Sequence, residues 1–357
     1  MEAEKKPFPP VVFVVIAVLL WSTGGLFIKL TTLDAYQVTF FRSLLAGITV
    51  LVVTRRNGLR INWFGVMASV IYATLLFLFV WATKHTTAAN AIFLQYTAPI
   101  YILIFAPFLI GEKFHLRDLV TVVFCIAGMS LFFVGKLEIA DYQGNIAALG
   151  SGIFLGLYIM LLKHPRAVGS RQSAVSSESE PVSVLTGVNS GSPPYEGGVA
   201  AASADGVVLS TPNPQFALRN PQPINPVITV IYGNFLLALL TLPSGVVAIT
   251  TAVAGFSSQP LTPISEPLTN FGAVAFLGIF QIGLSYILFI KGVTGGTRPL
   301  DASIIGFIEP LLNPVWVFLF VGEQPSNWAI LGGAIIVATV VAHTLNQYRT
   351  RPAAVAS

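Results

Sequence analysis

Charged residues are scarce in this chain, and their scarcity limits the class of protein that the sequence can encode. Only 10% of the 357 residues are charged, whereas 54% are hydrophobic. Soluble domains carry about 25% charged residues, so this chain lacks the polar surface that a water-facing globule needs. The composition therefore predicts an integral membrane protein whose main partner is the lipid bilayer.

Several other absences narrow the function further. Cys125 is the only cysteine, which excludes an intrachain disulfide. The sequence has no GxxxxGK[ST] phosphate-binding loop, no HExxH motif and no GxSxG motif, so no ATP-driven pump, metalloprotease or serine hydrolase is indicated. The four histidines are scattered at or beyond the ends of apolar runs, without metal-ligand spacing. We therefore expect no enzyme, no cofactor and no metal, and the small net charge of +4 gives no reason to expect nucleic-acid binding.

Long apolar runs dominate what is present. A helix needs about 20 mostly apolar residues to cross the hydrocarbon layer, and backbone groups in lipid must be paired within the helix. The sequence therefore predicts an all-α integral membrane protein with ten transmembrane helices, at residues 11–30, 36–54, 63–83, 88–110, 118–135, 143–162, 226–250, 269–291, 301–321 and 327–347.

The positive charges are distributed unevenly between the two ends of these runs. If the N-terminus is cytoplasmic, 15 of the 19 Lys and Arg residues lie on the cytoplasmic side. The other side holds only Lys29, Lys84 and Lys136, and Arg42 lies inside the second run. Because positive charges accumulate in cytoplasmic loops, we expect both termini to be cytoplasmic, in a protein of the plasma (inner) membrane.

One segment departs from the apolar pattern. Residues 164–223 are rich in Ser, Gly, Pro, Ala and Asn and show no helical period. Such a segment cannot bury enough apolar area to offset its ordering entropy, so we expect a disordered cytoplasmic loop. A passive tether and a regulatory or partner-binding loop both remain open.

The two halves of the chain share a repeated pattern. Asn90-Ala91, Pro99 and Gly111-Glu112 align with Asp301-Ala302, Pro310 and Gly322-Glu323 at a constant offset of about 211 residues. The first copy lies in the fourth run and the second in the ninth, so each half has five runs. Five is odd, and the halves must therefore have opposite orientations in the membrane. Inverted repeats are typical of secondary transporters, whose substrate site lies near the midplane between them.

The chain resembles the EamA-like group of the drug/metabolite transporter superfamily. The resemblance rests on four stretches: Leu20-Trp21-Ser22-Thr23-Gly24, Phe40-Phe41-Arg42, Ala88 to Glu112, and Ile308-Glu309-Pro310 with Gly322-Glu323. It implies ten helices in a 5+5 inverted arrangement and a role in carrying small metabolites, often outward. The expected organisation is therefore a cytoplasmic N-terminus (1–10), a first repeat (11–136), a second repeat (143–346) interrupted by the loop 164–223, and a cytoplasmic tail (347–357).

Glu309 is the most unusual residue of the apolar runs, because it lies near the middle of the ninth. A charged side chain there costs about 2.5–3.5 kcal/mol, so we expect it to face the bundle interior. It either lines a cavity and binds a cationic group or a proton, or it is satisfied by another helix and holds the bundle together. Its counterpart in the first repeat is Ala98. Helix breaks are predicted at Pro99, Pro310 and Pro314.

Arg42 is the only cation well inside a run. It snorkels to the outer interface, pairs with Glu309 or binds an anionic substrate group, and the sequence leaves these alternatives open. The other polar or aromatic candidates serve either as hydrogen bonds between helices or as the lining of a substrate cavity. They are Trp21, Thr23, Tyr72, Asn90, Gln95, Tyr96, Tyr158, Gln281, Tyr286 and Asn313.

The hypothesis that unites these observations is a secondary-active transporter that works by alternating access. It would export small metabolites, with amino acids and related compounds first, and proton coupling through Glu309 is part of the hypothesis. A homodimer contact through the fifth and tenth runs is a further expectation. The alternative is a non-transporting receptor or scaffold that signals through the loop 164–223.

Overall fold

The computed structural model describes residues 8–54, 59–86, 88–131, 134, 142–164, 225–258, 265–321 and 326–350. All regular structure in these ranges is helical, which confirms the all-α prediction. These helices belong to one compact unit, and the segment Gly169–Pro223, which holds most of the predicted loop, lies outside the described residues.

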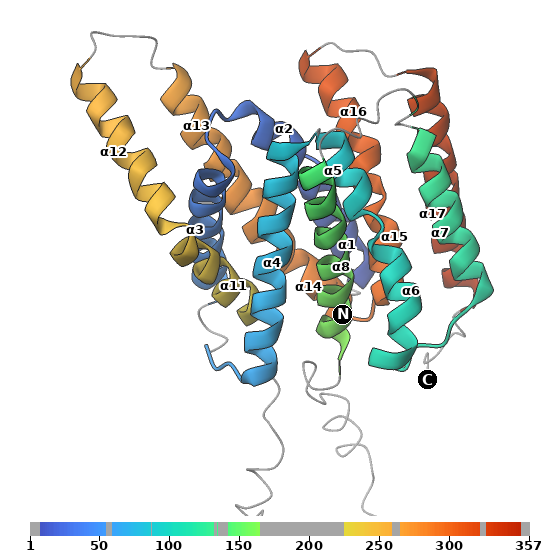
Figure 1. Cartoon of the computed structure of the whole chain (residues 1–357). Helices are drawn as coiled ribbons and strands as arrows, with labels where there is room; N and C mark the ends of the chain where they lie inside the picture. The colour runs from blue at the N-terminus through green and yellow to red at the C-terminus, as the bar shows by residue number, and fades with distance from the viewer. Residues whose placement is uncertain are drawn as a thin grey trace, which may run out of the picture. The chain divides into compact units, whose positions relative to one another are not determined.

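Helices occur at each of the ten predicted runs (Figure 1). The N-terminal part of the chain contains α1 (Pro10–Trp21), α2 (Gly24–Leu30), α3 (Ala35–Thr54), α4 (Trp63–His85), α5 (Ala88–Gln95), α6 (Ala98–Leu109), α7 (Leu116–Leu131) and α8 (Tyr142–Lys163). The C-terminal part contains α11 (Val227–Leu240), α12 (Leu242–Ser258), α13 (Ser265–Phe276), η2 (Leu277–Leu284), α14 (Ser285–Thr294), α15 (Pro299–Gly306), α16 (Ile308–Val321) and α17 (Asn327–Thr350).

Within the described residues, seven helical segments are long and apolar enough to cross a membrane. The number is eight if α11 and α12, which meet at an angle of 61°, form one bent span. The protein is therefore an integral membrane protein. The predicted count of ten spans and the inverted arrangement of the halves stay predictions.

The helices from distant parts of the chain pack closely together. α4 packs along α8, α3 lies between α11 and η2, α1 packs along α14, and α17 packs along α7. α1 begins and α17 ends at the same end of this bundle, the lower end in Figure 1. The buried apolar side chains form one large cluster that runs through the centre of these helices.

Besides the bend between α11 and α12, four helical segments are irregular near their middles. α1 gives way to α2 at residues 22–23, α5 to α6 at residues 96–97, and α15 to α16 at Phe307. Between α13 and α14, the eight residues of η2 form a π-helix. Breaks and π-helical turns are frequent at functional sites, because they release backbone groups and change the direction of side chains.

Two of the three predicted helix breaks coincide with interruptions. Pro99 is the second residue of α6 and Pro310 the third residue of α16, and each follows a break. The third does not, since α16 continues through Pro314 without interruption. Because lipid offers no water to pair with freed backbone groups, a continuous helix is preferred wherever the neighbouring turns can maintain it.

Gly278 of η2 lies at a close contact between η2 and α3. A Cβ atom there would lie 2.6 Å from Leu45 Cβ and 2.8 Å from the backbone oxygen of Arg42. We expect Gly278→Ala to force η2 away from α3 and to destabilise the protein by about 1–3 kcal/mol, seen as a lower thermal unfolding temperature in detergent. Gly272→Ala on α13 is the matched control, because a Cβ atom there meets nothing within 4 Å. An equal effect of the two substitutions would contradict the prediction.

Candidate functional site

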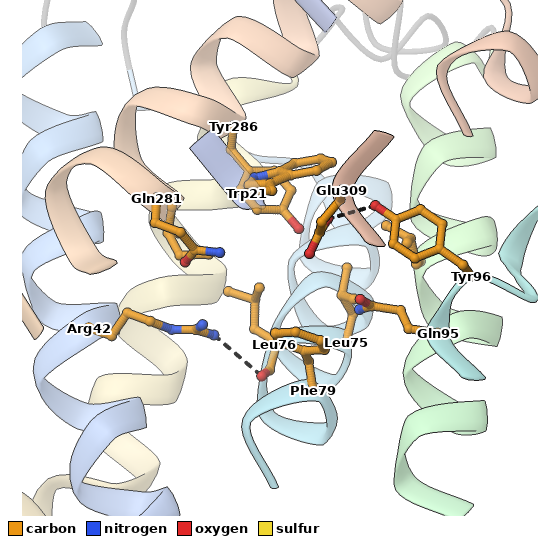
Figure 2. Close-up of a pocket in the computed structure, with 12 residues that line it drawn as sticks. Trp21, Arg42, Leu75, Leu76, Phe79, Gln95, Tyr96, Gln281, Tyr286 and Glu309 are labelled. Atoms are coloured by element: carbon orange, nitrogen blue, oxygen red, sulfur yellow. Dashed lines mark hydrogen bonds between the residues drawn. The ribbon is translucent and has the colours of Figure 1, made fainter. Parts of the chain in front are cut away.

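The irregular segments meet around one small cavity (Figure 2). Its volume is about 30 Å³, which is room for about two water molecules. The break after α1, the break between α5 and α6, the start of α16 and the π-helix η2 each contribute side chains to it. The lining residues are Trp21, Arg42, Leu75, Leu76, Phe79, Gln95, Tyr96, Leu155, Gln281, Ile282, Tyr286 and Glu309.

Glu309 is held by a tyrosine from the other half of the chain. The hydroxyl of Tyr96 donates a hydrogen bond of 2.6 Å to Glu309 Oε2, and both residues are buried. Tyr96 lies at the break after α5, and its ring packs near Phe307 at the break before α16. Gly306 permits this approach, because a Cβ atom there would lie 2.7 Å from the Tyr96 ring. The two helix breaks thus place the carboxyl group and its hydrogen-bond donor in contact.

Arg42 of α3 lines the same cavity and is fully buried, with 0% of its surface exposed. This placement is incompatible with snorkelling to the interface. Its Nη2 group donates a weak hydrogen bond of 3.4 Å to the carbonyl of Leu76. Nε and Nη1 have no hydrogen-bond partner among the described residues, and an unpaired buried donor is costly. A ligand with an acceptor group would satisfy these donors.

Ser285 connects Trp21 to the backbone of Gln281 beside the cavity. The indole Nε1 of Trp21 donates a hydrogen bond of 2.7 Å to Ser285 Oγ, which in turn donates to the backbone carbonyl of Gln281. The side-chain oxygen of Gln281 is buried and unpaired. Ser285 is absent from the candidates that sequence reasoning selected, although its place four residues after Gln281 puts both on one helix face.

An aromatic cluster supports the wall of the cavity. The rings of Trp21 and Tyr286 lie 4.9 Å apart, and Tyr286 meets Tyr72 edge-on at 4.8 Å. Tyr72 and Tyr158, 5.0 Å apart, pack behind Tyr286 and do not line the cavity themselves. Tyr72 accepts a hydrogen bond from Asn234, whose side-chain oxygen is unpaired. This packing fixes the position of Tyr286 at the cavity.

Of the remaining predicted residues, one lines the cavity and others make hydrogen bonds away from it. Gln95 lines the cavity and donates a hydrogen bond of 2.8 Å to Ser151. Asn90 is buried away from it and donates to Thr86, and Thr23 donates to the carbonyl of Leu20 in its own turn. The side chain of Asn313 lies outside the described part of the structure.

The apolar lining was not predicted from the sequence. Leu75, Leu76, Phe79, Leu155 and Ile282 all line the cavity, but each belongs to a run in which nearly every neighbour is also apolar. Hydropathy therefore distinguishes none of them from lipid-facing residues. Most of the polar candidates that line the cavity lie at or beside a helix irregularity, whereas Arg42 lies within the continuous helix α3.

Comparisons with known proteins agree with this architecture. The model of the EamA-like transporter family matches residues 8–134 and 222–344. The human protein solute carrier family 35 member G1 is 26% identical over 186 residues, which is 45% of this chain and 50% of that protein. The chain thus spans about half the length of this relative. A crystal structure of another protein covers 96% of this chain and 99% of its own, with a TM-score of 0.61 and 19% identity, which shows a similar fold.

Proposed function

Since this chain belongs to the EamA-like transporter family and is a membrane transporter, we propose that it carries small metabolites across the bilayer by alternating access between two five-helix halves. The two segments that match the family model are separated by residues 135–221, which include nearly all of the loop 164–223. This arrangement supports a transporter built from two related halves. It does not favour a receptor or scaffold.

The observation that carries the proposal is the chemistry of the cavity. Glu309, a carboxyl group, and Arg42, a guanidinium with two unpaired nitrogens, line one buried cavity (Figure 2). Their side-chain hydrogen bonds in the described residues go to Leu76 and Tyr96, and not to each other. A molecule with both an acidic and a basic group would match this pair, because each end would meet an opposite charge. Amino acids and their relatives are the smallest common metabolites of that kind.

The size of the cavity supports a conformational cycle. Sites for small molecules usually measure about 300–1,000 Å³, whereas this cavity holds about 30 Å³. The described conformation is therefore closed around the site, and binding requires the helices to separate. The breaks at residues 22–23, 96–97 and 307 are places where such a movement can be absorbed.

The direction of transport and its coupling to protons complete the proposal. We propose that Glu309 binds a proton and substrate in turn, and that the protein exports its substrate through the plasma (inner) membrane. The family resemblance supports export, and the distribution of Lys and Arg supports cytoplasmic termini. The common end of α1 and α17 fits that orientation. A homodimer through α7 and α17 stays part of the proposal, supported by exposed apolar residues such as Phe124 and Val341.

A thermal-shift screen of the purified protein against amino acids, amines and organic acids tests the cargo class. A ligand that binds only the folded protein stabilises it by about 2.7 kcal/mol at 100 times its Kd. We expect zwitterionic compounds to raise the unfolding temperature and Arg42→Gln to abolish that rise. Arg60→Gln, the same change at an exposed position, should retain it. Stabilisation by none of the zwitterions would contradict the proposed cargo.

A further inference from the structure

A second space large enough for a ligand lies between α7 and α17, which pack side by side (Figure 1). It is an open groove of about 640 Å³, and sites for small molecules usually measure about 300–1,000 Å³. None of the residues that line it also lines the central cavity. Phe124 and Ala338 on its walls are exposed, so the groove is a separate candidate site that opens toward the bilayer.

The wall from α7 is formed by Leu116, Arg117, Val120, Thr121 and Phe124. Their spacing of i, i+1, i+4, i+5 and i+8 places all five on one face of the helix. Leu116, Val120 and Phe124 are exposed, so this face offers an apolar surface that the described residues leave uncovered. Arg117 is the one charged residue of this wall, and it lies in the first turn of α7.

The wall from α17 repeats the same spacing. It is formed by Ala338, Thr339, Ala342, His343 and Asn346. Ala338 and Ala342 carry only a methyl group each, and they leave space that larger side chains would fill. His343 is buried, and its Nδ1 lies 3.2 Å from Thr121 Oγ1 of the other wall. The two walls therefore meet at the floor of the groove.

The groove occupies only one end of the α7–α17 pair. At the other end the helices are in close contact, because a Cβ atom on Gly128 would lie 3.0 Å from the backbone oxygen of Gly332. Gly128 is late in α7 and Gly332 is early in α17, so the two helices run in opposite directions. The groove therefore lies where α7 begins and α17 ends, which is the end predicted to be cytoplasmic.

Exposed basic residues lie at this end of the groove. Lys113 and His115 precede α7, and Arg117 follows within its first turn. Asp118, the acid next to Arg117, is buried and lies 2.8 Å from Arg298, which compensates its charge. Arg117 is 43% exposed, and its Nε lies 3.9 Å from Asp118 Oδ1, a long contact. Its guanidinium can therefore offer paired N–H donors, the geometry that binds a phosphate group.

We propose that this groove binds an anionic phospholipid, with one acyl chain along Val120, Phe124 and Ala338 and the phosphate group at Arg117. Basic pockets between transmembrane helices on the cytoplasmic side are suited to anionic headgroups. The lipid site is independent of the proposed cargo and of proton coupling at Glu309. A dimer contact through α7 and α17 would then include the lipid.

The headgroup decides which lipid binds. An acyl chain that moves from the bilayer into the groove exchanges one apolar environment for another, so the chain contributes little selectivity. Each Lys or Arg near the membrane surface strengthens the binding of an anionic lipid by about fivefold. A zwitterionic lipid has no net charge and gains much less. We therefore expect a preference of at least about fivefold for phosphatidylglycerol over phosphatidylcholine with the same acyl chains.

Native mass spectrometry of the full-length protein in detergent, with either of these two lipids added, tests the role of the headgroup. The wild-type protein should show the preference for phosphatidylglycerol, and Arg117→Gln should lose most of it. Arg117→Lys should retain most of it, because the positive charge remains. Arg60→Gln removes the same charge from an exposed position outside the groove and should leave the preference unchanged. Equal binding of the two lipids to the wild type, or an unchanged preference in Arg117→Gln, would overturn the proposal.

Ala338→Phe tests whether the acyl chain lies in the groove. A phenyl ring on this wall should occupy the space of the chain, and the variant should lose most of the bound phosphatidylglycerol. Ala334→Phe is the matched control, because it makes the same change at an exposed position of α17 that does not line the groove. An equal loss in both variants, or a loss in neither, would place the lipid elsewhere and refute the site. Lipid-free dimers that disappear in Ala338→Phe and persist in Ala334→Phe would show that a second copy of the chain fills the groove, which would also refute it.

Discussion

Glu309→Gln is expected to abolish substrate accumulation driven by a pH gradient. With a gradient of one pH unit, each coupled proton supports up to about tenfold accumulation, because one unit corresponds to about 1.36 kcal/mol. Gln has nearly the same shape and can still accept the hydrogen bond from Tyr96, but it cannot take up a proton. The compound that gives the largest thermal shift is then supplied to proteoliposomes. Vesicles that contain the variant should only equilibrate the compound, whereas vesicles that contain the wild-type protein should accumulate it.

Two comparisons make this result specific to the cavity. Asp34→Asn removes an acid from an exposed position and should leave gradient-driven accumulation unchanged. Exchange of labelled for unlabelled substrate in Glu309→Gln should continue, since alternating access without a gradient needs no proton. If Glu309→Gln accumulates substrate with the pH dependence of the wild type, proton coupling at Glu309 is wrong.

The sequence was informative about Glu309 because a membrane makes a misplaced charge expensive. One acid in the middle of an apolar run has few acceptable environments, and the structure places Glu309 in one of them, buried against Tyr96. The two prolines at an offset of 211 residues, Pro99 and Pro310, also lie in the first turns of helices that follow a break. Both features are local in the sequence, and each is energetically costly in a membrane unless the surrounding helices compensate for it. Both could therefore be interpreted without coordinates.

Other parts of the site carried no such local signature. The π-helix η2 contains no proline, and the break after α1 precedes Gly24 and Gly25, a pair typical of close helix packing as well as of helix breaks. A glycine pair fits both explanations equally well. Whether Arg42 reaches the interface or the core depends on how α3 is rotated between α11 and η2. That rotation is decided by tertiary packing, and hydropathy along α3 does not reveal it.

A cluster in which Arg298 lies near Asp118, Glu112 and Asp301 was missed for a different reason. Its partners Asp118 and His343 lie at the ends of apolar runs, where charged and polar residues usually mark the membrane boundary. Arg298 and Asp118 are 180 residues apart, and His343 and Asp301 are 42 apart. The histidines were therefore interpreted as scattered. Only the packing of α7 against α17 brings Thr121 to His343 and gives the cluster its geometry.

Arg298→Gln is expected to cause a large loss of stability, of about 2–3 kcal/mol. Removing one partner of a buried ion pair costs about 3–5 kcal/mol, and Arg298 is partly exposed, at 25%, which reduces the figure. The loss arises because the side chain of Asp118, which is 1% exposed, loses the guanidinium that lies 2.8 Å away. Thermal unfolding in detergent, followed by the accessibility of a dye-reactive thiol at Cys125, measures the effect.

The loss of stability caused by Arg298→Gln should also depend on pH. Burial raises the pKa of Glu112, and Arg298 is the largest of the influences that lower it. Without Arg298 the pKa of Glu112 rises further above its value in the unfolded chain. A carboxyl group with a raised pKa destabilises the folded state as it ionises, so stability falls as the pH increases through that pKa. The difference between Arg298→Gln and the wild type should therefore be smaller at pH 5 than at pH 8.

A double-mutant cycle separates the ion pair from a general effect of the substitution. Asp118→Asn removes the buried charge, so the double variant should be more stable than the sum of the two single losses implies, by about 0.5–3 kcal/mol. Arg60→Gln combined with Asp118→Asn should be additive, because Arg60 lies at an exposed position outside the cluster. Additive losses for Arg298 and Asp118 would mean that the 2.8 Å contact does not couple the halves. The stability of this end of the bundle would then depend on the packing of α7 against α17 rather than on charge.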